Sequence, residues 1–98
     1  MIALTFTGLI AEDARLFEGP DGRPSLAFTV KVRQSRKAAD GTNTTEFTFI
    51  RCTKTGASKA DRFFLKGQKI WIRGGINVEH HAASPDDLLC PVWQFELL

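Results

Sequence analysis

The chain has 98 residues, a net charge of +2, a hydrophobic fraction of 43% and a charged fraction of 24%. This length fits one domain, residues 1–98, built around a single core, and the composition excludes a disordered or fibrous protein. No apolar run is long enough to cross a bilayer and no signal peptide is evident, so we expect a cytoplasmic protein with no membrane partner.

The first predicted element is a strand over residues 2–10, where large apolar side chains at most even positions alternate with alanine, threonine and leucine. A period of two is typical of a strand with one buried face. A turn rich in proline and glycine follows at residues 18–24. A second strand is predicted over residues 26–33, with one apolar face and one partly basic face. The loop at residues 37–43 contains an Asp-Gly pair, which predicts a hairpin.

The third predicted strand covers residues 44–54, and its two faces differ in kind. One face carries Ile50 and Cys52, which we expect to point into the interior. The opposite face presents a row of two rings and a guanidinium, formed by Phe47, Phe49 and Arg51. A row of this composition on an outward face is unusual for a solvated surface and suggests a binding role.

The last third of the chain contains a short helix and two further strands. Residues 57–67 predict a helix of about two turns, with a serine near its start and a glycine at its end. A fourth strand is predicted over residues 68–79, and two adjacent glycines inside it predict a bulge or sharp bend. Residues 80–87 form a polar loop, and residues 90–98 a last strand.

This order of elements predicts a mainly all-β fold. Five antiparallel strands with a short helix between strands three and four constitute the OB-fold barrel. Barrels need bends, and the glycine pair in the fourth strand supplies one. An open five-stranded α+β sheet is the alternative.

Three stretches carry a resemblance to a known family: "FTGLIAEDARLFEGPDGRPSLAFTVKV", "EFTFIRC" and "ADRFFLKGQKIWIRGGI". In this order and with this spacing, they make the chain resemble the bacterial single-stranded DNA-binding proteins over nearly its whole length. The resemblance implies an OB-fold that binds single-stranded DNA without strong sequence preference. It also implies a role in coating and protecting DNA during replication, recombination or repair. The implied assembly is a homo-oligomer, a tetramer or a dimer.

The end of the chain departs from that family, whose members usually continue into a flexible tail with an acidic tip. This chain ends at "VWQFELL", where Glu96 is the only acid, so we expect a tailless or truncated member. A replication or primosome adaptor on the same barrel is the alternative function. Such an adaptor would mainly bind a protein partner, such as a replication protein, and touch DNA weakly. An OB subunit of a larger enzyme is a third interpretation.

The family stacks bases on aromatic side chains at recurring places, and this chain has part of that set. The corresponding positions hold Arg36, Phe49 or Phe47, Thr53 and His81. A phenyl ring offers a flat apolar surface to any base, and stacking is worth about 1–3 kcal/mol per base. We therefore predict that at least one of the two phenylalanines stacks on a base. The alternative is that one of them plugs a barrel end or a subunit interface.

The cations Lys31, Arg33, Arg36 and Lys37 lead into the predicted hairpin, and no acidic residue lies between Lys31 and Asp40. This hairpin wraps DNA in the resembled family, and phosphate contacts dominate affinity, so we predict phosphate contacts here. Arg51 can pair with phosphate or stack. Trp71 beside Arg73 suits single-strand binding, or else is buried between subunits. The predicted DNA-binding residues are Lys31, Arg33, Arg36, Lys37, Phe47, Phe49, Arg51, Trp71 and Arg73.

The remaining polar residues do not suggest catalysis. His80 and His81, taken with Cys52 or Cys90, match no structural zinc spacing. No segment resembles a nucleophile with its base, or a phosphate loop. We therefore predict no enzyme activity, no metal and no cofactor, and we interpret both cysteines as reduced, buried hydrophobes.

Overall fold

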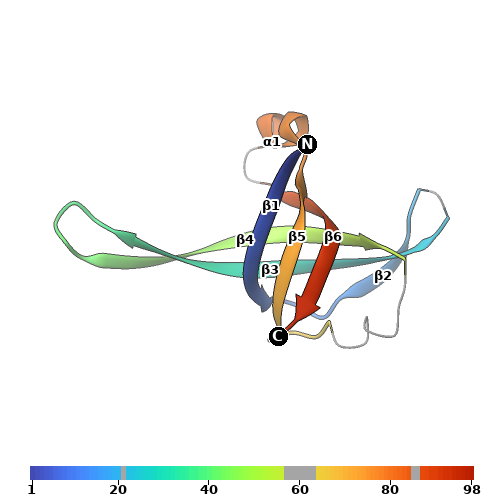
Figure 1. The fold of residues 1–98 in the computed structure, drawn as a ribbon, viewed down its shortest axis with the longest axis horizontal. Coiled ribbons are helices and arrows are strands. Elements are labelled where there is room, and N and C mark those ends of the chain that lie inside the picture. Colours follow the sequence, from blue (N-terminus) through green and yellow to red (C-terminus); the bar gives the residue numbers. More distant parts are fainter. Residues whose placement is uncertain (21, 57–63, 85–86) are drawn as a thin grey trace.

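The computed structural model describes residues 1–98 except 21, 57–63 and 85–86. Over these residues the chain is built mainly of strands, with one short helix (Figure 1). The elements are β1 (Ile2–Ile10), β2 (Arg15–Glu18), β3 (Pro24–Lys37), β4 (Asn43–Thr55), β5 (Lys69–Ile76), α1 (Val78–Ala83) and β6 (Leu89–Leu97).

Five of these strands close into a barrel, which confirms the predicted architecture. Their order is β1-β5-β6-β4-β3, and β3 pairs again with β1 to complete the circuit. The pairing of β4 with β6 is parallel, whereas the other pairings are antiparallel. β2 pairs with β3 outside this circuit, and the sequence pattern did not predict it.

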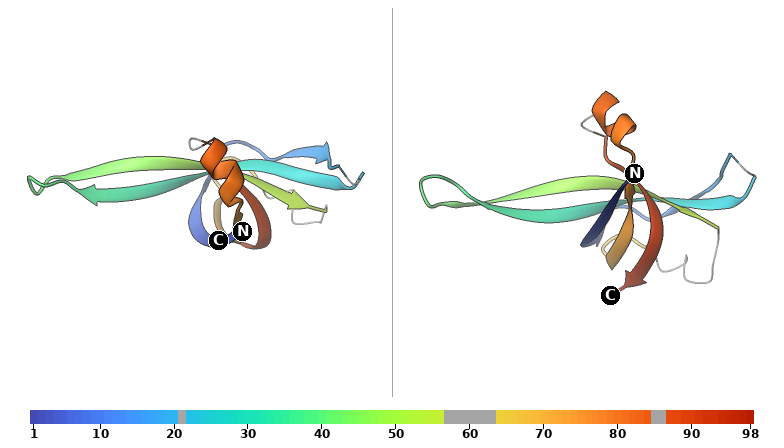
Figure 2. Two further views of the ribbon diagram at one scale, coloured as in Figure 1. Left: turned by 90° about the horizontal axis from the view of Figure 1, so that it is seen from above. Right: turned by 45° about the horizontal axis from the view of Figure 1, so that its top comes forward.

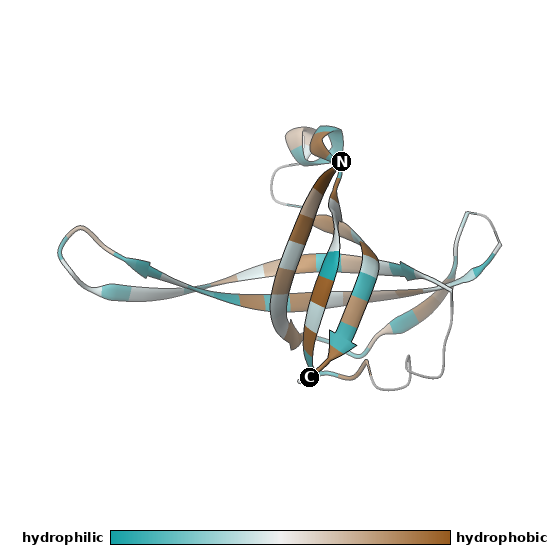
Figure 3. Cartoon of the chain, in the orientation of Figure 1, coloured by the Kyte–Doolittle hydropathy of each residue, from teal (hydrophilic) through white to brown (hydrophobic). Residues whose placement is uncertain are grey.

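The core lies inside the barrel and follows the alternation of the strands. Ile50 is 6% exposed and Cys52 1% exposed, which confirms that they point inward. Phe64 packs edge-on against Phe28 and Phe95, with ring centroids 5.0 Å apart in both pairs. Along β5 and β6, hydrophobic and hydrophilic residues alternate in Figure 3. The buried core residues are Ile10, Leu26, Phe28, Val30, Ile50, Cys52, Phe64, Ile70, Ile72 and Cys90.

Two glycines allow backbones to approach closely where the barrel bends. A Cβ at Gly8 would lie 2.5 Å from the carbonyl oxygen of Lys31, near the point where β1 meets β3. A Cβ at Gly74 would collide with the carbonyl oxygen of Pro91. The β5–β6 register shifts between Arg73 and Gly74, which confirms the bulge predicted from the glycine pair.

The strands β3 and β4 continue beyond the barrel as a two-stranded arm (Figures 1 and 2). Their pairing extends to Lys37 opposite Asn43, so both strands are longer than predicted. Gly41 has a φ of +87° in the turn at the tip, a conformation that glycine adopts at low cost. The predicted Asp-Gly hairpin is therefore confirmed.

The helix that the structure describes is not the one the sequence predicts. The predicted helix over residues 57–67 lies largely outside the described residues, and residues 64–67 form coil and a turn. The described helix, α1, lies instead between β5 and β6.

The prediction of a strand up to Glu79 followed by a polar loop was wrong. β5 ends at Ile76, and Asn77 caps α1 by accepting a hydrogen bond from the backbone N–H of His80, at 3.1 Å. This cap satisfies one of the backbone N–H groups that have no partner inside the first turn of the helix, and so favours the start of α1 at this point. None of the described helical segments is long and apolar enough to span a membrane.

Candidate nucleic-acid interface

The outward side chains of β3 and β4, which we call the outer face, bring cations and phenyl rings together. Strand pairing places Phe49 opposite Lys31 and Phe47 opposite Arg33. Phe47 is 49% exposed and Phe49 54% exposed, so neither ring belongs to the core. Nζ of Lys31 lies 4.1 Å from the centroid of the Phe47 ring, a cation–π contact between diagonal neighbours.

A groove of about 650 Å³ lies between β1 and the start of the hairpin arm. The ring of Phe47 and three cations line it, and none of the described lining residues is acidic. A second hollow, of about 290 Å³, is bordered by Phe49, Lys31 and Lys66, and it shares Leu9 with the groove. The groove residues are Thr7, Gly8, Leu9, Lys31, Arg33, Thr45, Phe47 and Lys69.

Arg51 lies on the same outer face but is already paired. Its Nε donates to Oδ1 of Asp87 at 2.7 Å, and its Nη2 donates to Oδ2 at 2.5 Å. His80 Nε2 lies 3.1 Å from the same Oδ2. The hydrogen bonds from Arg51 hold the pKa of the Asp87 carboxyl below its usual value, and the contact with His80 adds to this effect.

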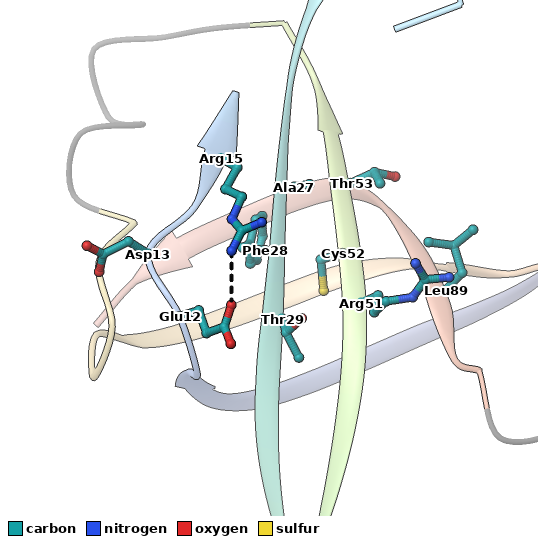
Figure 4. A pocket seen from close by; sticks show the side chains of 10 residues that line it. All are labelled: Glu12, Asp13, Arg15, Ala27, Phe28, Thr29, Arg51, Cys52, Thr53 and Leu89. Carbon is teal, nitrogen blue, oxygen red and sulfur yellow. Dashed lines mark ion pairs between the residues drawn. The ribbon is translucent and has the colours of Figure 1, made fainter. Parts of the chain in front are cut away.

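A smaller pocket, of about 210 Å³, lies at the Arg51 end of the outer face (Figure 4). Arg15 and Glu12 form an ion pair there, with Nη2 and Oε2 3.8 Å apart. Asp13 also lines the pocket, and one of its carboxylate oxygens accepts a hydrogen bond from the backbone N–H of Lys66 at 2.7 Å. Carboxylates therefore accompany the guanidinium groups at this end.

The other predicted site residues do not line the groove. Arg36 forms an ion pair with Glu46 on the arm, with Nε and Oε2 3.6 Å apart. Lys37 is exposed at the end of β3. Trp71 and Arg73 lie on the outward side of β5, where Trp71 is half-buried opposite Thr7 of β1. Of the nine predicted residues, the outer face brings together Lys31, Arg33, Phe47, Phe49 and Arg51.

The sequence pattern did not predict a role for Lys69, Lys66 or the outward side chains of β1. Lys69 lines the groove beside Leu9, its partner in the β1–β5 pairing. Its odd position in an alternating strand predicts that it points outward, but no local signal places it beside β3. Its role depends on barrel closure, which joins segments far apart in the sequence.

The two cysteines lie side by side in the core. Cys52 and Cys90 are opposite each other in the parallel β4–β6 pairing, and both are free thiols. A hydrogen bond with Cys90, together with burial, raises the pKa of the Cys52 thiol well above its usual value. Within the part of the chain that the structure describes, no group of three or more His, Cys, Asp or Glu side chains could hold a metal ion.

Solved structures of other proteins superpose on this barrel. The structure of a small single-stranded DNA-binding protein from Streptomyces coelicolor superposes with a TM-score of 0.73. The chain has the OB-fold. The match covers 99% of this chain and 93% of the Streptomyces chain, at 14% sequence identity.

Two further OB-fold structures are similar over the whole chain or nearly so. The single-stranded DNA-binding protein from Thermus aquaticus gives a TM-score of 0.72 at 13% identity, covering 100% of this chain and 50% of that one. PriB from Ralstonia solanacearum gives 0.68 at 14% identity, covering 99% and 97%. No protein-family model and no curated protein matches the sequence. At 13–14% identity, the likenesses to these solved structures show the fold alone.

Proposed function

We propose that the protein binds single-stranded DNA without strong sequence preference. In this role it coats and protects exposed strands during replication, recombination or repair. The observation that carries the proposal is the pairing of Phe47 and Phe49 with Arg33 and Lys31 on the outer face. Rings stack on any base and cations pair with any phosphate. The likeness to a Streptomyces protein described as single-stranded DNA-binding supports it.

The exposed rings favour a single strand over a duplex as the ligand. Bases in a duplex are already stacked on each other, whereas a single strand can turn its base faces toward Phe47 and Phe49. The groove beside Phe47 contains Lys31, Arg33 and Lys69 without a described carboxylate, so a polyanion meets no repulsion there. The proposed path of the strand runs along the outer face, with the groove at one end.

A titration with oligo(dT), followed by tryptophan emission, tests this function. We expect tight binding that weakens steeply as salt rises, because cation–phosphate contacts release counterions. Duplex DNA should compete poorly. An affinity unchanged between low and moderate salt, or a strong preference for one duplex sequence, would contradict the proposal. Weak DNA binding together with a tight protein partner would favour a replication adaptor instead.

In this proposal the protein is a binding module rather than an enzyme. We also propose that it works as a homo-oligomer, a dimer or a tetramer. β1 pairs with β5 from Ile2 to Leu9, but its described pairs with β3 are confined to Leu9 and Ile10. Among the described residues, the other edge of β1 from Ile2 to Gly8 therefore has no strand partner. An open edge is a template for pairing with another chain. Exposed Met1 and Trp93 are close to Gly75, the β5 partner of Ala3 in β1.

Light scattering at micromolar concentration tests the assembly. We expect the mass of a dimer or a tetramer, because pairing of β1 edges satisfies backbone groups and buries the neighbouring apolar side chains. A monomeric mass would contradict this part of the proposal without affecting the assignment of the DNA-binding face.

A further inference from the structure

The Arg51–Asp87 ion pair occupies the surface on which the proposed DNA strand would lie. Arg51 follows Phe47 and Phe49 in the outward row of β4 and lies opposite Thr29 of β3. Its side chain is 58% exposed, and that of Asp87 is 34% exposed. A ligand on the outer face can therefore reach the guanidinium group, but it meets the carboxylate there as well.

Several contacts hold Asp87 in place. Its backbone N–H donates to the carbonyl of Ser84, the C-cap of α1, at 3.0 Å. The carbonyl of Leu88, the next residue, accepts a hydrogen bond from the backbone N–H of Arg51 at 2.9 Å. His80 contacts the carboxylate from α1. Asp87 is thus fixed beside Arg51 by the backbone as well as by its own charge, unlike most surface ion pairs.

The chemistry of this contact is the same as that of an arginine–phosphate contact. A guanidinium group presents two parallel N–H donors, and a carboxylate or a phosphate accepts both of them. Asp87 accepts from Nε and Nη2 of Arg51, which are donors that a backbone phosphate would use. The two anions cannot both take this bidentate position.

We propose that Asp87 competes with DNA phosphate for Arg51 and thereby lowers affinity at this end of the outer face. The inference rests on the proposed single-stranded DNA binding. The other charges on this surface are distributed in the same way. Near Arg51, Arg15 is paired with Glu12, whereas the cations of the groove beside Phe47 have no described carboxylate among them. A bound strand is therefore directed toward Phe47 and Phe49, and Arg51 contributes only after Asp87 is displaced.

The substitution Asp87→Asn tests this inference, with Glu79→Gln as the matched control. Both remove one negative charge from the β5–β6 connection, but Glu79 lies in the first turn of α1 and is not the partner of Arg51. We expect Asp87→Asn to bind oligo(dT) at least about threefold more tightly at moderate salt. We also expect its log–log salt slope to steepen by about 0.7, the value for one more phosphate on a single strand. Glu79→Gln should remain within about twofold of wild type.

Arg51→Ala identifies the group that Asp87 restrains. In the wild-type background it should change the affinity less than about twofold and leave the salt slope unchanged, since Arg51 is already occupied. In the Asp87→Asn background it should abolish the gain. A gain that persists in the double variant, or equal affinities of Asp87→Asn and Glu79→Gln, would overturn the inference.

The outcomes also separate this inference from the proposed function. Wild-type binding with no response to Asp87→Asn would refute the competition alone, and absence of binding in wild type and all variants would refute both. If Asp87→Asn does not fold, Arg51→Ala decides. An unchanged salt slope supports competition, whereas a slope flattened by one phosphate contact shows that Arg51 binds DNA in the wild type.

Discussion

Truncation of three neighbouring side chains on β4 distinguishes a binding surface from packing. Ile50 is 6% exposed in the core, and Ile50→Ala should cost about 2–5 kcal/mol of the free energy of unfolding because it leaves a cavity. Phe49 keeps 54% of its surface exposed, so Phe49→Ala should cost less than about 1.5 kcal/mol. Phe47→Ala also removes the contact with Lys31, which adds about 0.5–1 kcal/mol.

Binding should show the opposite order. A ring that stacks on a base contributes about 1–3 kcal/mol, so at least one Phe→Ala variant should bind oligo(dT) about 5- to 150-fold more weakly. Ile50→Ala, measured at a temperature where it is folded, should bind nearly as wild type does. Leu16→Ala provides the control, because Leu16 is exposed and apolar but lies on β2, at 68% exposure.

Melting temperature and oligo(dT) affinity, measured on all four variants, decide between these two roles. The reasoning is refuted if both Phe→Ala variants melt as early as Ile50→Ala and bind normally once folded. In that case the two rings are packing elements, and the DNA-binding surface lies elsewhere. An equal loss of binding in Leu16→Ala would show that the assay reports general apolar contact.

Three further predictions concern stability and thiol chemistry. Gly8→Ala should lower the free energy of unfolding in urea by about 1–3 kcal/mol or more, because the added Cβ meets the Lys31 carbonyl oxygen at 2.5 Å; wild-type stability would show that the β1–β3 junction relaxes. Cys52 and Cys90 are at most 1% exposed, so Ellman's reagent should label them only on unfolding, and rapid labelling of the native protein would contradict their burial. Arg51 lowers the pKa of Asp87 in the folded state. The ion pair therefore contributes fully to the free energy of unfolding above the unfolded pKa of about 3.9, and this contribution is lost as the pH falls through the folded pKa. Melting curves should therefore show an acid-side loss in wild type that Asp87→Asn lacks, and parallel losses in the two proteins would contradict it.

The sequence predicts the barrel well because the alternation of apolar and polar residues along a strand directly reflects which side chains are buried. The inward positions of β3 and β4, including Ile50 and Cys52, follow from a period of two. The Asp-Gly pair predicts the hairpin because its glycine, Gly41, adopts a positive φ at low cost. The two glycines of β5 predict the bulge because a Cβ at either position would collide with neighbouring atoms. These signals are local, and a single chain segment contains each of them.

The missed elements lack such a local signal. All four residues of β2 are exposed, so burial leaves no pattern there. α1 has six residues and no buried one, so it shows no apolar stripe of the kind that identifies a helix. Its formation depends on the Asn77 cap and on the preceding strand ending at Ile76.

The candidate site was only partly predictable, because charges close in sequence need not share a face. Arg33 and Arg36 are three residues apart on β3 and therefore point to opposite sides, and Arg36 pairs with Glu46 instead. The partner of Arg51 lies 36 residues away along the chain. No spacing rule predicts an ion pair that forms only when β6 aligns with β4.

The net charge of +2 is too small to attract a polyanion strongly by itself, so the local arrangement of charge must decide where a strand binds. Where Lys31, Arg33 and Lys69 border the groove, none of the described lining residues is acidic, so a phosphate contact there releases counterions without displacing a lining carboxylate. At Arg51, a phosphate must displace a carboxylate that the backbone holds in place. Two cationic regions of one face can therefore differ in affinity although their arginines and lysines look equivalent in the sequence. The acidic residues beside them make the difference, and for that reason a gain of binding on removal of Asp87 is a sharper test of this face than a loss of binding on removal of any cation.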